Sequence, residues 1–477
     1  MVASRPINSL PDMSTPIAAR NPLPPLCVDL DGTLIRTDLL LESVLRLIGR
    51  NPLFFFMLPV WLLRGRATLK AEVAARVELN PAALPYDIPL LDWLRAERER
   101  GRDLWLCTAA NERLAGQVAS HLGVFAGFVA SDQRRNLSGR SKAQRLIEAF
   151  GDGGFDYCGN ERRDLAVWQH VHARVAPALD TFSPRASRWR ALARAVRPHQ
   201  WAKNVLILVP LLTSHRAGNL TALGTTLLAL LAFSLCASAV YVLNDLLDLE
   251  ADRKHPRKAS RPFAAGEATI ASGLVLIPLL LAAAAVLATL LPVAFRLSLA
   301  AYFALTLAYS LNLKRRVLLD AMALAGLYTL RIIAGAAATS IALSFWLLLF
   351  SVFLFLSLAF AKRYAELDEL RRQHRLRAEG RGYQTDDLPI LRSMGTASGY
   401  LCVLVLALYI NSPDVGALYH RPKIIWLLCV VMLYWISRLW VVAQRGKLHD
   451  DPVIYALTDR VSLMTGVLAA FIIAAAI

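Results

Sequence analysis

The chain has 477 residues, 56% of them hydrophobic, and its 53 Lys and Arg against 36 Asp and Glu leave a net charge of +17. Soluble domains are roughly 45–50% apolar, so this composition excludes an ordinary soluble protein and indicates that part of the chain is solvated by lipid. The positive charge would suggest nucleic-acid binding in a soluble protein, but in a membrane protein basic loops beside anionic lipid account for it. We therefore expect membrane lipid as a partner and no nucleic acid.

The N-terminal stretch up to Pro25 is rich in proline and has no apolar segment typical of a secretory signal. We expect residues 1–23 to be poorly ordered and the domain that follows to stay in the cytoplasm. The six cysteines occur singly within apolar runs, without a Cys-x-x-Cys pair, which favours reduced core residues over zinc or redox chemistry.

An apolar strand beginning at Leu26 ends in Asp29 and Asp31, which Gly32 and Thr33 follow. Open α/β folds bind ligands at the carboxyl edge of the sheet, where these two acids are expected. The Asp-x-Asp-Gly-Thr pattern in this setting resembles the first motif of the haloacid dehalogenase superfamily of phosphatases.

Three later segments resemble the remaining motifs of that superfamily: a strand ending in Thr108, a helix opening with Lys142, and an acidic loop with Asn160 and Asp164. The resemblance implies an α/β domain over residues 24–182, with a Rossmannoid sheet and a helical cap at about 35–100. It also implies Asp29 as the nucleophile that forms an aspartyl-phosphate and Asp31 as the acid/base, Thr108 and Lys142 as phosphate ligands, and Asp29, Asp31, Asn160 and Asp164 as Mg²⁺ ligands.

The fourth motif departs from the family, which usually has Gly-Asp where this chain has Gly159-Asn160. An asparagine still offers an oxygen to Mg²⁺ but removes a charge, so metal affinity falls unless Glu161 or Asp164 compensates. Both an active phosphatase and a degenerate regulatory or scaffolding domain stay open.

An eleven-residue apolar run from Leu53 to Leu63 lies between Arg50 and Arg64. It is too short to span a bilayer, and two interpretations stay open: a segment that dips into the membrane interface, or a buried helix of the cap. Residues 183–197 are rich in arginine and predict a basic linker along the membrane surface.

Residues 198–477 predict an all-α polytopic membrane domain of about nine transmembrane helices. The predicted spans are 204–214, 220–243, 268–291, 295–313, 317–338, 341–361, 395–411, 423–442 and 460–477. Most loop cations fall on the side of the N-terminus, which predicts an inner-membrane protein with its N-terminal domain and active sites in the cytoplasm.

Acidic residues stand among these basic loops at the end of the second span. Asp245, Asp248 and Asp252 are spaced i, i+3 and i+7, so a continuous helix would carry all three on one face, where a divalent cation makes their repulsion tolerable. A solvated helix end with ordinary salt bridges is the alternative. The candidate phosphate-binding residues nearby are Asn244, Lys254, Lys258 and Arg261.

This Asn-Asp-x-x-Asp-x-x-x-Asp pattern, the His-Pro-x-Lys-x-x-Arg-Pro that follows it and the spans around it resemble the UbiA-type intramembrane prenyltransferase superfamily. The resemblance covers about residues 190–477 and implies Asp245, Asp248 and Asp252 as ligands of Mg²⁺ and diphosphate. Where the superfamily usually has a second Asp-rich motif, this chain has Lys362, Arg363 and Glu366. Extra cations suit substrates that carry several phosphates.

Three segments resemble one branch, the decaprenyl-phosphate phosphoribosyltransferases: 197–204, 309–314 and 362–366. The branch transfers 5-phosphoribose from phosphoribosyl diphosphate to a polyprenyl phosphate, which leads to lipid-linked arabinose precursors, and an active phosphatase would then remove the 5-phosphate. The further substrate-binding residues expected from these segments are Lys203, Tyr309, Lys314, Lys362, Arg363 and Glu366.

Two other functions stay open. One is a UbiA-type aromatic prenyltransferase of quinone or haem synthesis with a non-catalytic N-terminal domain. The other is a transporter, against which the placement of the charges at span ends argues. Asp320 and Arg331 are expected to form a satisfied pair at the fifth span, and a homo-oligomer is compatible with the sequence.

Overall fold

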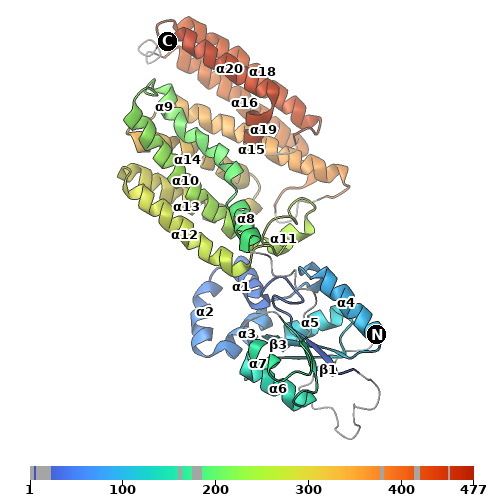
Figure 1. Cartoon of the computed structure of the whole chain (residues 1–477). Helices are drawn as coiled ribbons and strands as arrows, with labels where there is room; N and C mark the ends of the chain where they lie inside the picture. The colour runs from blue at the N-terminus through green and yellow to red at the C-terminus, as the bar shows by residue number, and fades with distance from the viewer. Residues whose placement is uncertain are drawn as a thin grey trace. The chain divides into compact units, whose positions relative to one another are not determined.

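The computed structural model describes the chain in two compact units, and Figure 1 shows their secondary structure. The residues it describes are 5–6, 23–159, 164–174, 185–376, 381–412, 419–448 and 452–477. The first unit comprises Met1–Val196 with Tyr241–Ile277, and the second comprises Arg197–Val240 with Pro278–Ile477. The acidic segment after the second predicted span therefore packs in the first unit, together with the N-terminal region.

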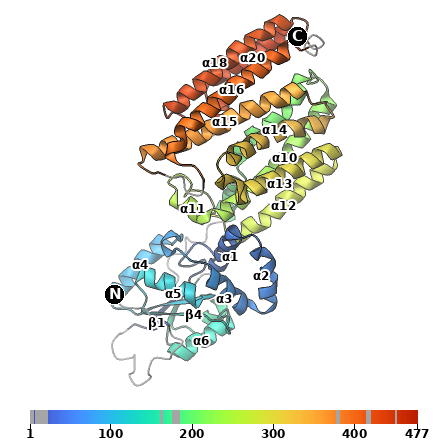
Figure 2. The same cartoon turned by 180° about the vertical axis from the view of Figure 1, so that it is seen from behind.

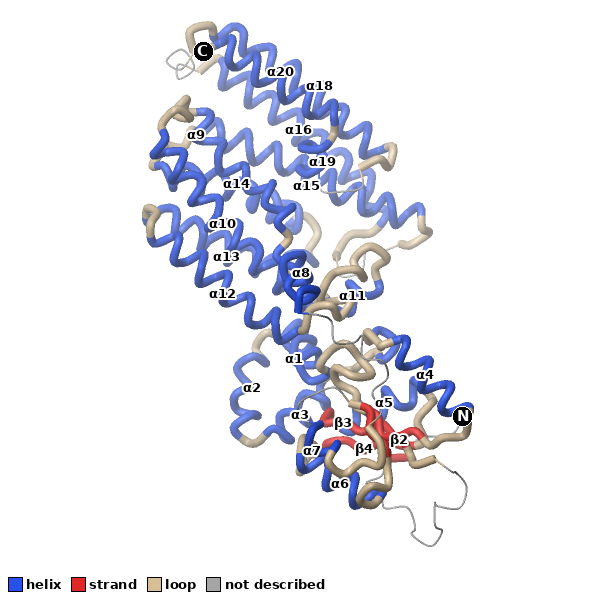
Figure 3. The backbone as a smooth tube through the Cα atoms, viewed as in Figure 1, coloured by secondary structure: helices blue, strands red, loops and turns tan. Residues whose placement is uncertain are grey.

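A five-stranded parallel sheet forms the centre of the first unit, with the order β1-β4-β3-β2-β5 (red in Figure 3). Its strands are β1 Arg5–Pro6, β2 Leu26–Val28, β3 Leu104–Asn111, β4 Gly127–Ser131 and β5 Asp156–Cys158. Strand β2 is buried throughout, as expected for an apolar run between two parallel neighbours. The predicted α/β character is confirmed, and the assignment to the haloacid dehalogenase superfamily stays a prediction.

The described residues of the first unit also form nine complete helices. Eight come from the N-terminal region, and the ninth comes from the acidic segment after the second predicted span. They are α1 Leu39–Arg50, α2 Phe54–Leu63, α3 Arg66–Arg76, α4 Ile88–Glu99, α5 Glu112–Leu122, α6 Arg140–Phe150, α7 Leu165–Trp168, α8 Arg185–Val196 and α11 Leu249–Lys254. Asp38 and Asp87 start α1 and α4 by accepting hydrogen bonds from backbone N–H groups of the first turn. Helix α8, where a basic linker was predicted, buries Ala191 and Ala195 against Leu246 and Phe263.

The second unit is helical. Its helices are α9 Val209–Thr213, α13 Val293–Leu311, α14 Leu319–Thr339, α15 Phe345–Arg372, α16 Leu388–Ile410, α18 Trp426–Gln444, α19 Pro452–Thr458 and α20 Arg460–Ala476, while α10 Leu220–Leu247 and α12 Ile270–Thr289 each continue from one unit into the other. Successive helices from α13 to α16 pack side by side, followed by α18 and α20 (Figure 2).

Seven helices in the described ranges are long and apolar enough to cross a membrane, or eight if the pair α19 and α20, bent by 77°, is one span. The prediction of nine is therefore too high. The first predicted span, 204–214, is instead a 3₁₀ stretch over Pro198–Leu208 followed by the five-residue α9. Pro198 and Pro210 at the starts of these two turns each lack the N–H that a longer helix would use. The multi-pass membrane character of the protein is confirmed.

Glycine sets the spacing of two of the helix contacts in the second unit. A Cβ at Gly335 on α14 would lie 2.0 Å from the carbonyl oxygen of Ile207. A Cβ at Gly395 on α16 would lie 2.1 Å from the indole ring of Trp440 on α18. Because lipid gives no hydrophobic driving force between helices, close packing at such small residues supplies much of their packing energy.

Candidate functional site

Three predicted phosphatase residues meet at the carboxyl edge of the sheet. The ammonium of Lys142, at the start of α6, donates to Asp29 Oδ1 (2.8 Å), to the Tyr157 hydroxyl (2.9 Å) and to Asp164 Oδ1 (3.4 Å). All of these side chains are buried. Burial acts to lower the pKa of Lys142, but the carboxylates of Asp29 and Asp164 outweigh it and raise the pKa above its usual value. Lys142 is therefore a permanent cation between two acids.

Asp31 lies beside this group and is fixed by the backbone N–H of Leu39, which donates to its Oδ1 at 2.8 Å. Burial, with the charges of Asp38 and Asp29 next, raises the pKa of Asp31 to about 8. Burial also raises the pKa of Asp29, against the lowering effect of Lys142. Asp31, with its raised pKa, can therefore hold a proton at neutral pH and donate it to a leaving group.

Thr108 is a buried residue in the second half of β3, and its hydroxyl oxygen accepts from the N–H of Ala110 at 3.0 Å. Thr33 donates to Asp29 Oδ2 at 3.3 Å. Asn160, the departure from the family motif, lies outside the described residues. The structure brings Asp29, Lys142 and Asp164 together, and their roles stay predictions. The sequence analysis did not single out Tyr157, which joins Lys142 to Asp164.

The acidic motif lies at the end of α10. Asp245 and Asp252 are buried, and the Arg261 guanidinium donates one Nη1 to both, at 3.0 Å to Asp245 Oδ1 and 2.6 Å to Asp252 Oδ2. Burial raises the pKa of Asp252, against the lowering effect of Arg261. Two carboxylates therefore converge on one point, which a cationic side chain occupies.

The spacing of Asp245, Asp248 and Asp252 predicted one continuous helix that carries all three acids. This prediction is wrong. Helix α10 ends at Leu247, and Asp248, with φ −102° and ψ 16°, is the residue from which α11 begins. Among the described residues, no group of three or more His, Cys, Asp or Glu is arranged to hold a metal ion. The oxygen donors of Asp245 and Asp252 fit Mg²⁺ in kind, and Asn244 Oδ1 is buried and accepts no hydrogen bond from the described residues.

Arg253, directly after Asp252, connects this segment to the N-terminal region. Its guanidinium donates to both carboxylate oxygens of Glu42 on α1, at 2.7 and 3.1 Å, and to the carbonyl oxygens of Ala83 and Ala264. Both charged side chains are largely buried. On the same segment, Glu250 accepts from Arg46 on α1 and from Asn80.

Sequence reasoning missed Glu42 and Arg253. One signal was present, because Glu42 lies three residues from both Leu39 and Leu45, on the buried face of α1. A carboxylate on such a face must be paired. The sequence does not say which cation it meets.

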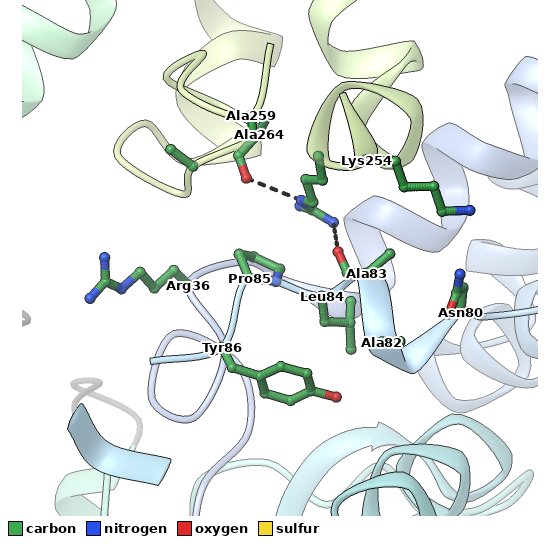
Figure 4. A pocket seen from close by; sticks show the side chains of 12 residues that line it. Arg36, Asn80, Ala82, Ala83, Leu84, Pro85, Tyr86, Lys254, Ala259 and Ala264 are labelled. Carbon is green, nitrogen blue, oxygen red and sulfur yellow. Dashed lines mark hydrogen bonds between the residues drawn. The ribbon is translucent and has the colours of Figure 1, made fainter. Parts of the chain in front are cut away.

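A cavity of about 570 Å³ opens beside this pair, between residues 82–86 and the segment around Arg253 (Figure 4). Arg253, which donates to the carbonyl oxygens of Ala264 and Ala83, lines it together with Arg36, Lys254 and Tyr86. Lys254 bonds Glu250 at 2.8 Å and Arg36 bonds Asp87 at 3.2 Å, so both cations are partly neutralised.

In the second unit, Arg363 on α15 is almost fully buried rather than exposed to a ligand. It pairs with Asp320 on α14, donates to Glu366 at 2.5 Å, and donates to the Tyr309 hydroxyl at 2.9 Å. Arg381 adds charge to this group, 3.6 Å from Asp320 and 3.5 Å from Glu366. Three predicted site residues, Tyr309, Arg363 and Glu366, thus come together around Asp320.

The expected pair of Asp320 and Arg331 is wrong for the described part of the chain. Arg331 donates instead to Asn204 Oδ1 at 2.8 Å and lies over the rings of Phe233, Tyr302 and Tyr328. Arg331 and Arg363 are both buried between helices, where each needs partners for its charge. Of the other predicted cations, Lys203 is buried, and Lys258, Lys314 and Lys362 are half-buried with interactions of their own.

Comparison with known proteins decides the family. Residues 206–474 match the UbiA prenyltransferase family. The chain belongs to this family. The UbiA match begins within the 3₁₀ stretch of the second unit, includes the acidic segment, and ends in α20.

Individual relatives of this UbiA chain differ in how much of it they match. An uncharacterized protein of Sinorhizobium fredii, y4nM, is 38% identical over 94% of this chain and 90% of its own. The nodulation protein NoeC of Azorhizobium caulinodans is 38% identical over 57% of this chain and 88% of its own. The decaprenyl-phosphate phosphoribosyltransferase of Mycobacterium tuberculosis is 32% identical over 58% of this chain and 91% of its own.

Proposed function

We propose that the protein is a polyprenyl-phosphate phosphoribosyltransferase, which moves 5-phosphoribose from phosphoribosyl diphosphate to a polyprenyl phosphate such as decaprenyl phosphate. The observation that carries the proposal is the convergence of Asp245 and Asp252 on Arg261. Acids and a guanidinium together suit a diphosphate that arrives with a metal. The similarity to an enzyme named for this reaction supports the choice of substrates.

In this reaction a bond forms between an oxygen of the lipid phosphate and C1 of the ribose, while the bond from C1 to the diphosphate oxygen breaks. The acceptor is already an anion, so the protein needs no general base. Its residues bind and orient the reactants and stabilise the developing charge. Bound Mg²⁺, for which Asp245, Asp248 and Asp252 are the proposed ligands, would withdraw charge from the leaving diphosphate.

The cations divide into two roles in this proposal. Arg261 exchanges its carboxylate partners for diphosphate oxygens when the donor binds, and Asn244 and the basic side chains near it take part in the same site. Arg363 keeps Asp320, Glu366 and Tyr309 in place and acts as a positioning residue. The further proposed phosphate-binding residues are Lys203, Lys254, Lys258, Lys314 and Lys362.

We further propose that the first unit is a phosphatase that removes the 5-phosphate of the lipid product, giving polyprenyl-phosphoryl ribose. Asp29 attacks phosphorus, Asp31 protonates the leaving sugar oxygen, and water then releases phosphate from Asp29. Lys142 and Thr108 hold the phosphate oxygens. Asp29, Asn160 and Asp164 are the proposed metal ligands, and the proximity of Asp29 and Asp164 to one cation supports this choice for two of them. Asp31, also expected from the sequence as a ligand, serves as the proton donor in this proposal, because a carboxyl that binds a metal must be deprotonated.

The family description also favours a second candidate, transfer of a prenyl group to an aromatic acceptor. The two candidates differ in the donor that is consumed, so one assay with both donors separates them. The extra cation Lys362, where the superfamily usually has a second Asp-rich motif, favours the phosphate-rich substrates, since a prenyl diphosphate brings a single polyanionic group.

The transferase proposal is tested with the purified full-length protein, Mg²⁺, radiolabelled phosphoribosyl diphosphate and decaprenyl phosphate. Wild type is expected to give a labelled lipid, and D245N to lose about a hundredfold or more of the rate, as for removal of a group that stabilises transition-state charge. D92N is the matched control, because Asp92 is an exposed acid on α4. If the label moves to lipid equally well with D245N, the assignment of the acidic motif fails.

The phosphatase proposal is tested on the same product. D29N is expected to accumulate the phosphorylated lipid while the rate of transfer stays unchanged, and the control D103N, at an exposed acid, to behave like wild type. Equal phosphate release by D29N and wild type would instead favour the scaffolding role.

A further inference from the structure

Helix α2 of the first unit presents apolar side chains to the outside. Leu63 is 90% exposed, Phe56 72% and Leu53 69%. A helix that is apolar all round is normally buried in protein or lipid, and monomers rarely expose such a contiguous patch. We call these exposed apolar residues the α2 surface: Leu53, Phe55, Phe56, Met57, Val60, Leu62 and Leu63.

One face of α2, with Phe54, Leu58 and Trp61, packs against the rest of the first unit. Trp61 is the buried residue of α2, and it packs in a cluster with Leu47, Val73 and Val77, with the guanidinium of Arg76 5.0 Å from its ring centroid. The helix lies at the margin of the first unit in both views of the fold (Figures 1 and 2). The α2 surface therefore points away from the core of its own unit.

The neighbouring helix reaches the end of a membrane span. Leu45 of α1 packs with Leu246 and Val242 of α10, and a Cβ at Gly49 would lie 3.9 Å from Leu247, the last residue of α10. Helix α2 begins four residues after α1 ends. Because α10 is long and apolar enough to cross a membrane, its last turn is expected in the headgroup region.

We propose that the α2 surface inserts into the interface of an anionic lipid bilayer. Ten residues rise about 15 Å, half the hydrocarbon thickness of about 30 Å, so the helix lies in the interface and does not cross. Exposed arginines stand on both flanks, at Arg50, Arg64 and Arg66, where lipid phosphates lie. The same cations would face one another if a second copy covered the patch symmetrically, which makes the membrane the better occupant.

This contact would hold the first unit against the surface from which a lipid-borne phosphate is presented. The benefit for a lipid-borne substrate rests on the phosphatase function proposed above, whereas the insertion of the α2 surface into lipid does not. The two are therefore tested separately.

The contact is tested in nanodiscs that hold one copy of the full-length protein. F56C is labelled with an environment-sensitive fluorophore, and R95C, on the exposed side of α4, is the matched control. The six natural cysteines are buried, so the introduced thiol is the one that reacts readily. Lipids with a nitroxide on the acyl chain near the headgroup are expected to quench the Phe56 label at least about twofold more than the Arg95 label, and less when phosphatidylcholine replaces phosphatidylglycerol. Equal quenching of both labels, or shielding of the Phe56 label only in discs with two copies, would overturn the proposal.

A second variant keeps the fold and removes the apolar surface. F55S/F56S/L63S leaves Trp61 in place, and its phosphate release from a soluble phosphomonoester is expected to equal wild type, while release from a phosphorylated lipid in vesicles falls at least about fivefold. Equal loss on both substrates would contradict the membrane role. If neither substrate is hydrolysed by wild type, the phosphatase proposal fails while the quenching result still stands.

Discussion

Glu42 and Arg253 form a buried, two-bonded ion pair between α1 and the residue that follows Asp252. The same helix starts at Leu39, whose N–H donates to Asp31. Helix α1 thus contacts both candidate sites of the first unit, with Asp31 at its first residue and the acidic segment one turn later. The N-terminal region is therefore expected to support the geometry of the acidic motif.

The first prediction concerns this ion pair. E42Q leaves the Arg253 guanidinium buried without a full countercharge, which is expected to destabilise the protein by about 3–5 kcal/mol and to slow phosphoribosyl transfer through misplacement of Asp252. Thermal unfolding and transfer kinetics measure the two effects. E72Q is the control, since Glu72 makes a more exposed pair on α3. An E42Q protein with wild-type transfer rate and stability would show that α1 plays no part in holding the motif.

The second prediction ranks two acids. Asp252 is buried and contacts Arg261, whereas Asp248 is half-buried and begins α11. D252N is therefore expected to raise the Mg²⁺ concentration for half-maximal transfer by about tenfold or more, and D248N by less. Titration of Mg²⁺ at saturating donor decides the order. The reverse order would place the metal on the other side of the helix break.

The third prediction separates Arg363 from its neighbour in sequence. R363K cannot reach Asp320, Glu366 and Tyr309 together, because a lysine lacks the forked donor geometry, so a stability loss of about 3–5 kcal/mol is expected. K362M is expected to raise KM for a phosphate-bearing substrate with little change in unfolding temperature. Unfolding of the detergent-solubilised variants and steady-state kinetics test the pair. A stable R363K protein with a raised KM would contradict the positioning role and show that Arg363 binds the substrate directly.

The fourth prediction concerns Lys142. Asp29 and Asp164 hold its pKa above the usual value, so Lys142 is charged at neutral pH. K142M removes it and leaves Asp29 and Asp164 with like charges, so phosphate release is expected to fall by about a hundredfold or more. R145M, on the outer face of the same helix, serves as the control. Full activity of K142M on a soluble phosphomonoester would exclude Lys142 as a phosphate ligand.

Local pattern predicted much of this structure. The strand before Asp29 and the helix that carries Lys142 lie where the sequence indicated, because strands and helix starts have short-range signals. The second strand was expected to end at Thr108 but continues to Asn111. Eight of the predicted spans correspond to apolar helices for the same reason, one of them through a bent pair.

What the sequence did not predict depends on contacts between distant residues. Arg363 and Asp320 are 43 residues apart in the sequence, and Arg253 and Glu42 are 211 residues apart. A charged residue on a buried helix face must have a partner, but the local sequence does not identify which residue that partner is. The break at Asp248 was also missed, since the i, i+3, i+7 spacing assumes a continuous helix.

Mass analysis of the lipid made by the purified full-length protein from phosphoribosyl diphosphate and decaprenyl phosphate tests the central claim most directly. The account predicts decaprenyl-phosphoryl ribose with wild type, its 5-phosphorylated form with D29N, and unchanged decaprenyl phosphate with D245N. Unchanged decaprenyl phosphate with wild type, or the same product from wild type and D245N, would contradict it.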